Sequence, residues 1–221
     1  MGNHAENRLK KLLARIIINY TYGRLEKLEV VFTMNISRIN YPGFGSFRMF
    51  ATNRMLKFRA ESFLSKEPTT IDWIKQLESD SILIDVGANV GIYTIPCALF
   101  HVKKVIALEP EPKNYSMLLD NLDLNRLTDD KVEAMPLAIS TKFANNSTKL
   151  FLTVDEAGAS CHQVGENQNH LLEKINKDSR KTRSIYCVSL ASVVQRVAKD
   201  HHGPIHIKVD VDGIEEDVCQ S

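Results

Sequence analysis

Short apolar runs alternate with helical apolar patterns through the second half of the chain. Residues 82–86, 105–108 and 205–211 are mostly apolar, which is typical of strands buried on both faces of a sheet. Apolar residues also recur at helical spacing, which predicts helices at 90–100 and 112–125. Repeated strand–helix units of this kind predict an α/β fold with a doubly wound, mostly parallel sheet.

Further elements complete this region of the chain. Strands are expected at 132–139, 149–154 and 185–188. Ser189 can cap a helix that follows the last of them. The intervening residues 155–183 are polar and predict a loop with one short helix around 171–175.

An amphipathic helix is predicted near the N-terminus. Residues 8–21 carry Leu and Ile at helical spacing, with basic residues between them. Such a helix usually docks on its own domain or on a partner subunit. A peripheral contact with a membrane surface is the alternative.

A β-hairpin is expected after that helix. Short strands are predicted at 28–34 and 46–50, joined by a glycine-containing turn at 42–45. We therefore expect an N-terminal extension at 1–66, made of helix and hairpin, and a second domain at 67–221.

The composition indicates a globular domain without a membrane-spanning helix. The chain has 221 residues, 43% of them hydrophobic, and a net charge of +1, which suits a globular domain with a full-sized core. No apolar run approaches the roughly 20 residues of a transmembrane helix, and no secretory signal is evident. The four cysteines are scattered, which predicts reduced thiols of a cytoplasmic protein and no metal site.

The near-zero net charge conceals an asymmetry. Residues 1–75 hold 13 Lys and Arg against 6 Asp and Glu, whereas the remaining residues hold 15 against 21. The basic part could face an acidic partner or a membrane, although a solvated basic face is the commoner case. No basic stripe interleaved with aromatic residues is present, so no nucleic-acid partner is expected.

The turn after the strand at 82–86 carries the first candidate site. Its sequence is Asp85-Val-Gly87-Ala88-Asn89-Val-Gly91. Dinucleotide-binding turns have a glycine where this chain has Asn89, because the backbone there must approach a pyrophosphate. The amino-acid end of S-adenosylmethionine (SAM) fits such a turn better, and Asp85 could accept a hydrogen bond from its ammonium group.

Glu109 supports a nucleoside site at the same sheet edge. It ends the strand at 105–108, and a carboxylate in that place can accept hydrogen bonds from both ribose hydroxyls. NAD remains compatible with this residue, so a nicotinamide-dependent oxidoreductase is one alternative function.

A third group of polar residues lies at the end of the strand at 205–211. Lys208, Asp210 and Asp212 are ionisable groups where the ligand crevice of an α/β sheet is expected. Asp210 could orient or deprotonate an acceptor hydroxyl, with Asp212 and Lys208 in support. A calcium loop is the less favoured alternative, because the spacing to Glu215 is too short for an EF-hand.

Several short motifs together resemble the FkbM-type methyltransferases. They are listed in chain order: Asp85 to Gly91, Leu108-Glu-Pro110, Asn121-x-x-x-Asn125, Leu137-Ala-Ile139 and Ile207 to Glu215. The resemblance implies a class I SAM-dependent (Rossmann-like) fold and O-methylation of a hydroxyl on a sugar, glycan or polyketide-like small molecule. It also implies that Asp85 and the turn from Gly87 to Gly91 hold the methionine end of SAM, and that Glu109 holds the ribose.

The chain departs from this resemblance at its C-terminal end. It stops at Ser221, soon after the fourth expected core strand, whereas a class I sheet normally has seven strands. We therefore expect a sheet whose last strands are missing. A non-catalytic fragment that only binds SAM or a partner is the second alternative function.

Overall fold

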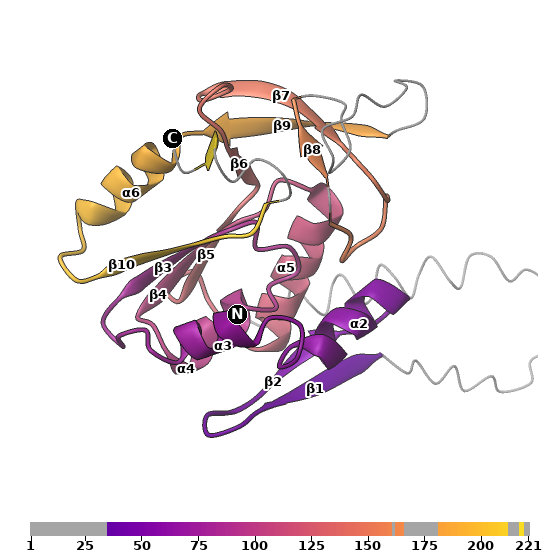
Figure 1. Ribbon diagram of the computed structural model, residues 1–221, viewed down its shortest axis with the longest axis vertical. Helices are drawn as coiled ribbons and strands as arrows, with labels where there is room; N and C mark the ends of the chain where they lie inside the picture. Colours follow the sequence, from indigo (N-terminus) through magenta and orange to yellow (C-terminus); the bar gives the residue numbers. More distant parts are fainter. Residues whose placement is uncertain (1–34, 161, 166–180, 212–216, 219–221) are drawn as a thin grey trace, which may run out of the picture. The chain divides into compact units, whose positions relative to one another are not determined.

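The computed structural model describes residues 35–160, 162–165, 181–211 and 217–218 (Figure 1). They belong to one unit of the chain, Met34–Ser221. The helices expected at 8–21 and 171–175, the strand at 28–34 and Asp212 lie outside the described residues. The proposed contact of the N-terminal helix with a membrane or subunit therefore stays a prediction.

A parallel sheet of four strands forms the centre of this unit. The strands are β3 (Ile82–Val86), β4 (Lys104–Leu108), β5 (Val132–Met135) and β10 (Ile205–Val209), in the order β10-β3-β4-β5. All five residues of β3 are buried, as expected for a strand covered on both faces. The predicted α/β fold with a mostly parallel sheet is confirmed.

Helices cover both faces of the sheet (Figure 1). Successive residues of each strand point to opposite faces, so the apolar strands have side chains to bury on both sides. On one face, Leu83 and Val105 pack with α3 (Pro68–Ile74), α4 (Thr94–Phe100) and α5 (Pro112–Leu124). On the other face, Ile84 and Ile106 pack against α6 (Leu190–Ala198). Ser189 caps α6 as expected, since its hydroxyl accepts from the Ser192 amide.

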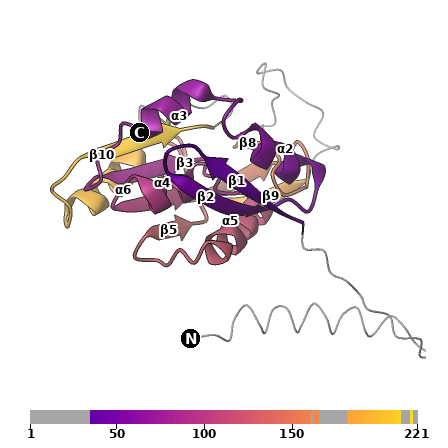
Figure 2. The same cartoon turned by 90° about the horizontal axis from the view of Figure 1, so that it is seen from below.

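A β-hairpin and a short helix join the first of these cores. β1 (Ile36–Tyr41) pairs antiparallel with β2 (Gly45–Phe50), and α2 (Arg54–Ser62) lies beside them (Figure 2). The expected turn at 42–45 is present, but the strand before it is β1 at Ile36–Tyr41, whereas the sequence predicted a strand at 28–34. Hairpin and helix share a core with α3 to α5, so they belong to the layer that covers this face of the sheet. The domain boundary at residue 66 stays a prediction.

A second sheet was not expected. It contains β6 (Leu137–Ile139), β9 (Thr182–Val188), β7 (Asn146–Phe151) and β8 (Gln163–Val164), in that order. The single strand predicted at 132–139 is wrong, because Pro136 has no N–H to continue the ladder and separates β5 from β6. The loop predicted at 155–183 is wrong in part, since it contains β8 and the start of β9. No helix in the described part of the chain is long and apolar enough to cross a membrane.

Candidate functional site

The turn after β3 is shaped by three residues with left-handed backbone conformation. Gly87, Asn89 and Gly91 have φ values of 79°, 51° and 88°. A side chain on Gly87 would overlap the carbonyl oxygen of Asp210, and one on Gly91 would come within 2.7 Å of Leu118. Glycine is therefore needed at both positions, because the end of β10 and the helix α5 approach the turn closely.

The backbone amides of this turn are all used within the protein. The amides of Gly87 and Ala88 donate to the carbonyl oxygen of Leu108 at 2.9 and 3.0 Å, and the Gly91 amide donates to Ala88 at 2.9 Å. The Val90 amide donates to the Asn89 side chain at 3.0 Å. These amides are therefore not available to a phosphate group.

Glu109 holds the turn against the end of β4. One carboxylate oxygen accepts from the Asn89 amide at 2.8 Å, and the other accepts from the Glu111 amide at 2.8 Å. Burial raises the pKa of Glu109 to about 7, although these amides favour the ionised form. The Asn114 side chain also hydrogen-bonds this carboxylate, and one acceptor position of Glu109 is left for a ligand hydroxyl.

Glu111 is a second buried carboxylate in the same place. Its Oε2 accepts from the Asn114 amide at 2.7 Å and so caps α5. Its Oε1 is buried and has no hydrogen-bond partner among the described residues. A buried carboxylate oxygen without a donor is costly, so this atom is well suited to accept from a ligand. Glu111 was not among the residues expected at the site, and the sequence Glu109-Pro-Glu111-Pro was the available signal.

The loop 157–159 faces these carboxylates and is pinned by side chains from three elements. Asn89 and Asn114 both donate to the carbonyl oxygen of Ala159, at 2.8 and 3.1 Å. Asn114 also accepts from the Gly158 amide at 2.8 Å, while Arg59 donates to the Gly158 carbonyl oxygen at 2.7 Å. The loop is thereby fixed as a wall, which the sequence did not indicate.

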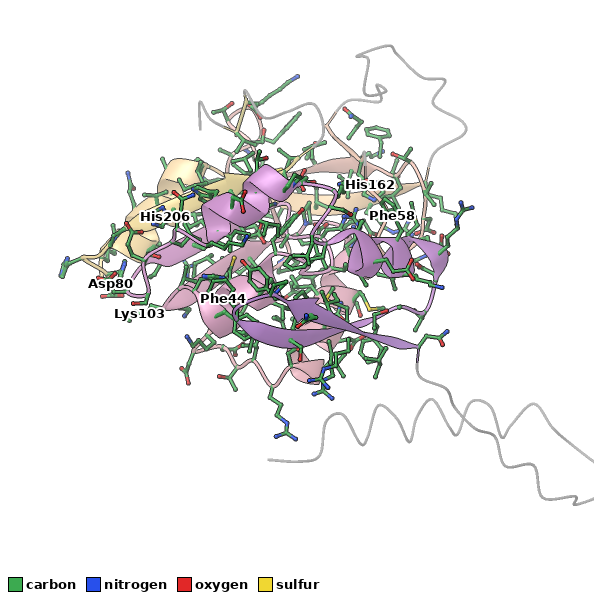
Figure 3. The ribbon with its side chains drawn as sticks, turned by 60° about the horizontal axis from the view of Figure 1, so that its bottom comes forward. Phe44, Phe58, Asp80, Lys103, His162 and His206 are labelled. Carbon is green, nitrogen blue, oxygen red and sulfur yellow. The ribbon has the colours of Figure 1, made fainter. Side chains whose placement is uncertain are left out.

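A cleft with an enclosed volume of about 120 Å³, open to solvent at its mouth, lies between these parts. Its lining combines the sheet edge, the start of α5, the pinned loop and the second sheet. Among the lining residues are Gly87, Asn89, Glu109, Glu111, Asn114, Leu150, Ala159, His162 and Asp210. Figure 3 labels His162 at this end of the molecule and Asp80 with Lys103 at the other.

Lys208 and Asp85 form a buried ion pair behind the cleft. They face each other on neighbouring strands β10 and β3, with 3.2 Å between Nζ and Oδ1. Thr94 donates to the other oxygen of Asp85 at 2.6 Å. Burial opposes the charge on Lys208, but the carboxylates of Asp85 and Asp210 outweigh it and raise the pKa of Lys208. Lys208 therefore stays charged.

Asp210 has one side toward Lys208 and one toward the cleft. Its Oδ2 lies 3.6 Å from Lys208 Nζ, and half of its side chain is exposed. His206, earlier on the same strand, instead pairs with Glu78 at 2.6 Å and is not among the residues that line the cleft.

The expected site residues thus divide into two groups. Gly87, Asn89, Glu109 and Asp210 line the cleft, whereas Asp85, Ala88, Gly91 and Lys208 are not among the lining residues. Both oxygens of Asp85 have protein partners, so a ligand contact through Asp85 stays a prediction. No group of three or more His, Cys, Asp or Glu in the described part of the chain could hold a metal ion.

Comparison with known proteins finds a similarity in the central segment. Residues 62–149 match the TRM5/TYW2 methyltransferase domain. A curated relative is the tRNA(Phe) (4-demethylwyosine(37)-C(7)) aminocarboxypropyltransferase of Pyrococcus horikoshii, 33% identical over 55 residues. The matched part covers 25% of this chain and 20% of that relative, so the chain spans about a fifth of its length.

Two solved structures have partial likeness to the chain. P. horikoshii TYW2, solved with MeSAdo, is 18% identical with a TM-score of 0.32, and the match covers 59% of this chain and 47% of that one. Methanocaldococcus jannaschii Trm5, solved with adenosine, is 20% identical with a TM-score of 0.31, covering 46% and 29%.

These findings confirm part of the expectation and correct the rest. The class of enzyme domain, a SAM-dependent methyltransferase with a class I fold, is confirmed, and SAM is the cofactor of that class. The assignment to the FkbM type is not supported, because the match is to the TRM5/TYW2 domain. The expectation of no nucleic-acid partner is wrong, because the curated relative is named for a reaction on tRNA. The segment 62–149 is thus similar to a methyltransferase domain found in tRNA-modifying enzymes.

Proposed function

We propose that this chain is a SAM-dependent enzyme that modifies a base of an RNA, in the manner of the tRNA-modifying relatives. The observation that carries the proposal is the pair of buried carboxylates, Glu109 and Glu111, that line one cleft beside the turn Gly87–Gly91. The match of residues 62–149 supports it, since it includes the turn and both carboxylates. The O-methylation of a sugar or polyketide has no such support.

The residues of the cleft fit the cofactor in their donor and acceptor pattern. Glu109 offers one further acceptor position and Glu111 one unpartnered oxygen, which suits the hydroxyl and amino donors of a nucleoside. The occupied amides of Gly87–Gly91 suit a ligand that has no pyrophosphate. This pattern favours SAM over a nicotinamide dinucleotide.

Asp210 is the proposed group that acts on the acceptor. When bound, SAM supplies an electrophilic carbon attached to a positively charged sulfur. Asp210, half exposed at the cleft, would orient the acceptor base or take its proton. Lys208, fixed by Asp85, would position that carboxylate. Asp212 lies outside the described residues, and its supporting role stays a prediction.

Two ligands test this proposal directly. Calorimetric titration of the chain with SAM and with NAD is expected to give binding with SAM alone. Incubation with SAM and an unmodified tRNA transcript is then expected to give a modified nucleoside, detected by mass spectrometry after digestion. Tight binding of NAD without binding of SAM would contradict the proposal. Failure to modify any RNA in the presence of SAM would contradict it as well.

The transferred group has two candidates. The matched domain is a methyltransferase domain, whereas the curated relative is named for transfer of an aminocarboxypropyl group. The mass added to the nucleoside separates a methyl group from an aminocarboxypropyl group. We favour methyl transfer, since the domain match covers more of this chain than the relative does.

A further inference from the structure

Three basic side chains converge on one carboxylate beside the cleft. Asp155 lies in the loop between β7 and β8, and its oxygens lie 2.9 Å from Lys113 Nζ, 2.8 Å from Lys181 Nζ and 3.0 Å from an Arg183 nitrogen. These four residues come from α5, from that loop, and from the start of β9. We call Lys113, Lys181 and Arg183 the basic cluster.

The basic cluster keeps an excess of positive charge. Hydrogen bonds from Lys181 and Lys113 hold the pKa of Asp155 well below its usual range, so Asp155 stays ionised. It can neutralise only one of the three cations. Glu156 follows in the chain and is exposed, and even with its charge the group remains positive. Close like charges repel one another, so an additional anion would be attracted there.

The basic side chains are accessible to such an anion. The Asp155 side chain is only 14% exposed, but those of Lys113 and Lys181 are 46% and 68% exposed. Arg183 is 33% exposed and keeps further guanidinium N–H donors beyond those directed to Asp155 and to the Thr182 carbonyl oxygen. An incoming phosphate can therefore reach all three cations without displacing Asp155.

The basic cluster is not part of the cleft lining, but two of its residues are neighbours of lining residues. Lys113 stands between Glu111 and Asn114, two residues that line the cleft. Arg183 pairs across the second sheet with Leu150, another lining residue, so both point to the same side of that sheet. An acceptor held at the cleft would thus have its neighbouring backbone close to these cations.

We propose that the basic cluster binds a backbone phosphate of the RNA whose base enters the cleft. The inference rests on the proposed function, because it assigns the position of that same RNA. Phosphate contacts from Lys and Arg fix the register and orientation of a nucleic acid without reading its sequence. Here these contacts would determine which nucleotide reaches the carboxylates. Two flexible lysine side chains beside one arginine can together donate to several oxygens of one phosphate.

The test compares charge-removing and charge-retaining variants of the full chain. Binding of an unmodified tRNA transcript is measured by fluorescence anisotropy at several salt concentrations. For Lys181→Gln combined with Arg183→Gln, we expect roughly 10-fold weaker binding and a shallower dependence on salt, by about one unit of slope per lost contact. Lys181→Arg retains the charge and is expected to bind as the original does.

Two further variants separate this proposal from a general charge effect. Lys103→Gln removes an exposed lysine that precedes β4, at the other end of the molecule (Figure 3), and is expected to leave binding unchanged. Asp155→Asn leaves three cations without their carboxylate and is expected to tighten RNA binding at low salt. Thermal unfolding of each variant shows whether the loop stays folded.

The outcomes distinguish the basic cluster from the proposed function. If the chain binds SAM and RNA, but the Gln variants keep the original affinity and salt dependence, the basic cluster is not the phosphate site and the function stands. If the chain binds SAM without binding RNA, both are overturned. Weaker RNA binding with unchanged SAM affinity supports the basic cluster.

Discussion

Lys208 Nζ lies 3.2 Å from Asp85 Oδ1, and the two side chains are buried on adjacent parallel strands. Neither side chain is among the residues that line the cleft, yet the pair places a fixed positive charge behind Asp210. Asp85 was expected to contact the ligand directly, and Lys208 was expected to support Asp210. Because both side chains are buried, we also expect the pair to stabilise the fold, and the free energy of unfolding measures this contribution.

Removal of Lys208 is expected to destabilise the fold strongly. Lys208→Met leaves the Asp85 carboxylate buried beside a single hydroxyl donor, and breaking a buried pair in this way costs about 3–5 kcal/mol. Urea denaturation measures the change. Lys75→Met, which breaks an exposed pair with Asp72, is the matched control and is expected to cost less than about 1 kcal/mol. Equal effects of the two substitutions would contradict the buried pair.

Stability is expected to depend on pH through Glu109. Its pKa of about 7 in the folded chain lies above the ordinary 4.5, so the folded state binds a proton that the unfolded state releases. This contribution to stability is fully present below about pH 4.5 and is lost as the pH rises to 7, by up to about 1.4 kcal/mol per pH unit.

Glu109→Gln removes that titration. The unfolding free energy of the original minus that of this variant is measured between pH 4.5 and 8. We therefore expect this difference to fall as the pH rises to 7 and then to level off. A constant difference across the range would contradict the raised pKa.

Glu111→Gln is expected to weaken SAM binding while leaving stability nearly unchanged. Gln keeps one carbonyl oxygen for the cap to Asn114, but replaces the unpartnered oxygen with an N–H donor. Loss of a hydrogen bond to a charged group costs about 1.5–3 kcal/mol, which is roughly 10-fold or more in affinity. Calorimetry with SAM measures it. Unchanged affinity would mean that the cofactor does not use this oxygen.

Two glycines with similar backbone angles are expected to respond differently to alanine. Gly43 and Gly87 have φ values of 84° and 79°, and this conformation costs an alanine about 1–2 kcal/mol at either position. A side chain on Gly43 meets nothing within 4 Å, whereas one on Gly87 overlaps Asp210. Gly87→Ala is therefore expected to cost about 1–3 kcal/mol more in urea denaturation, and to reduce SAM affinity.

The sequence predicted what local patterns encode. Apolar runs gave the strands β3, β4 and β10, because a strand buried on both faces needs such a run. Gly87 and Glu109 were predicted as site residues, since a strand-to-helix turn and the end of the next strand meet at one sheet edge, and both line the cleft. The second sheet was missed, because Pro136 interrupts one apolar stretch and only tertiary pairing assigns its two halves to different sheets.

The amino-acid sequence by itself determined the parallel sheet, the glycine turn and the carboxylate at the end of β4, because each is written in neighbouring residues. Only the tertiary structure decided that Glu111 Oε1 is buried without a described partner. Only it likewise brought Lys113, Asp155 and Arg183 into contact. Those residues are far apart along the chain, and the positive and negative charges of the whole chain nearly cancel. A net charge of +1 therefore gave no sign of a local excess that an RNA phosphate could occupy.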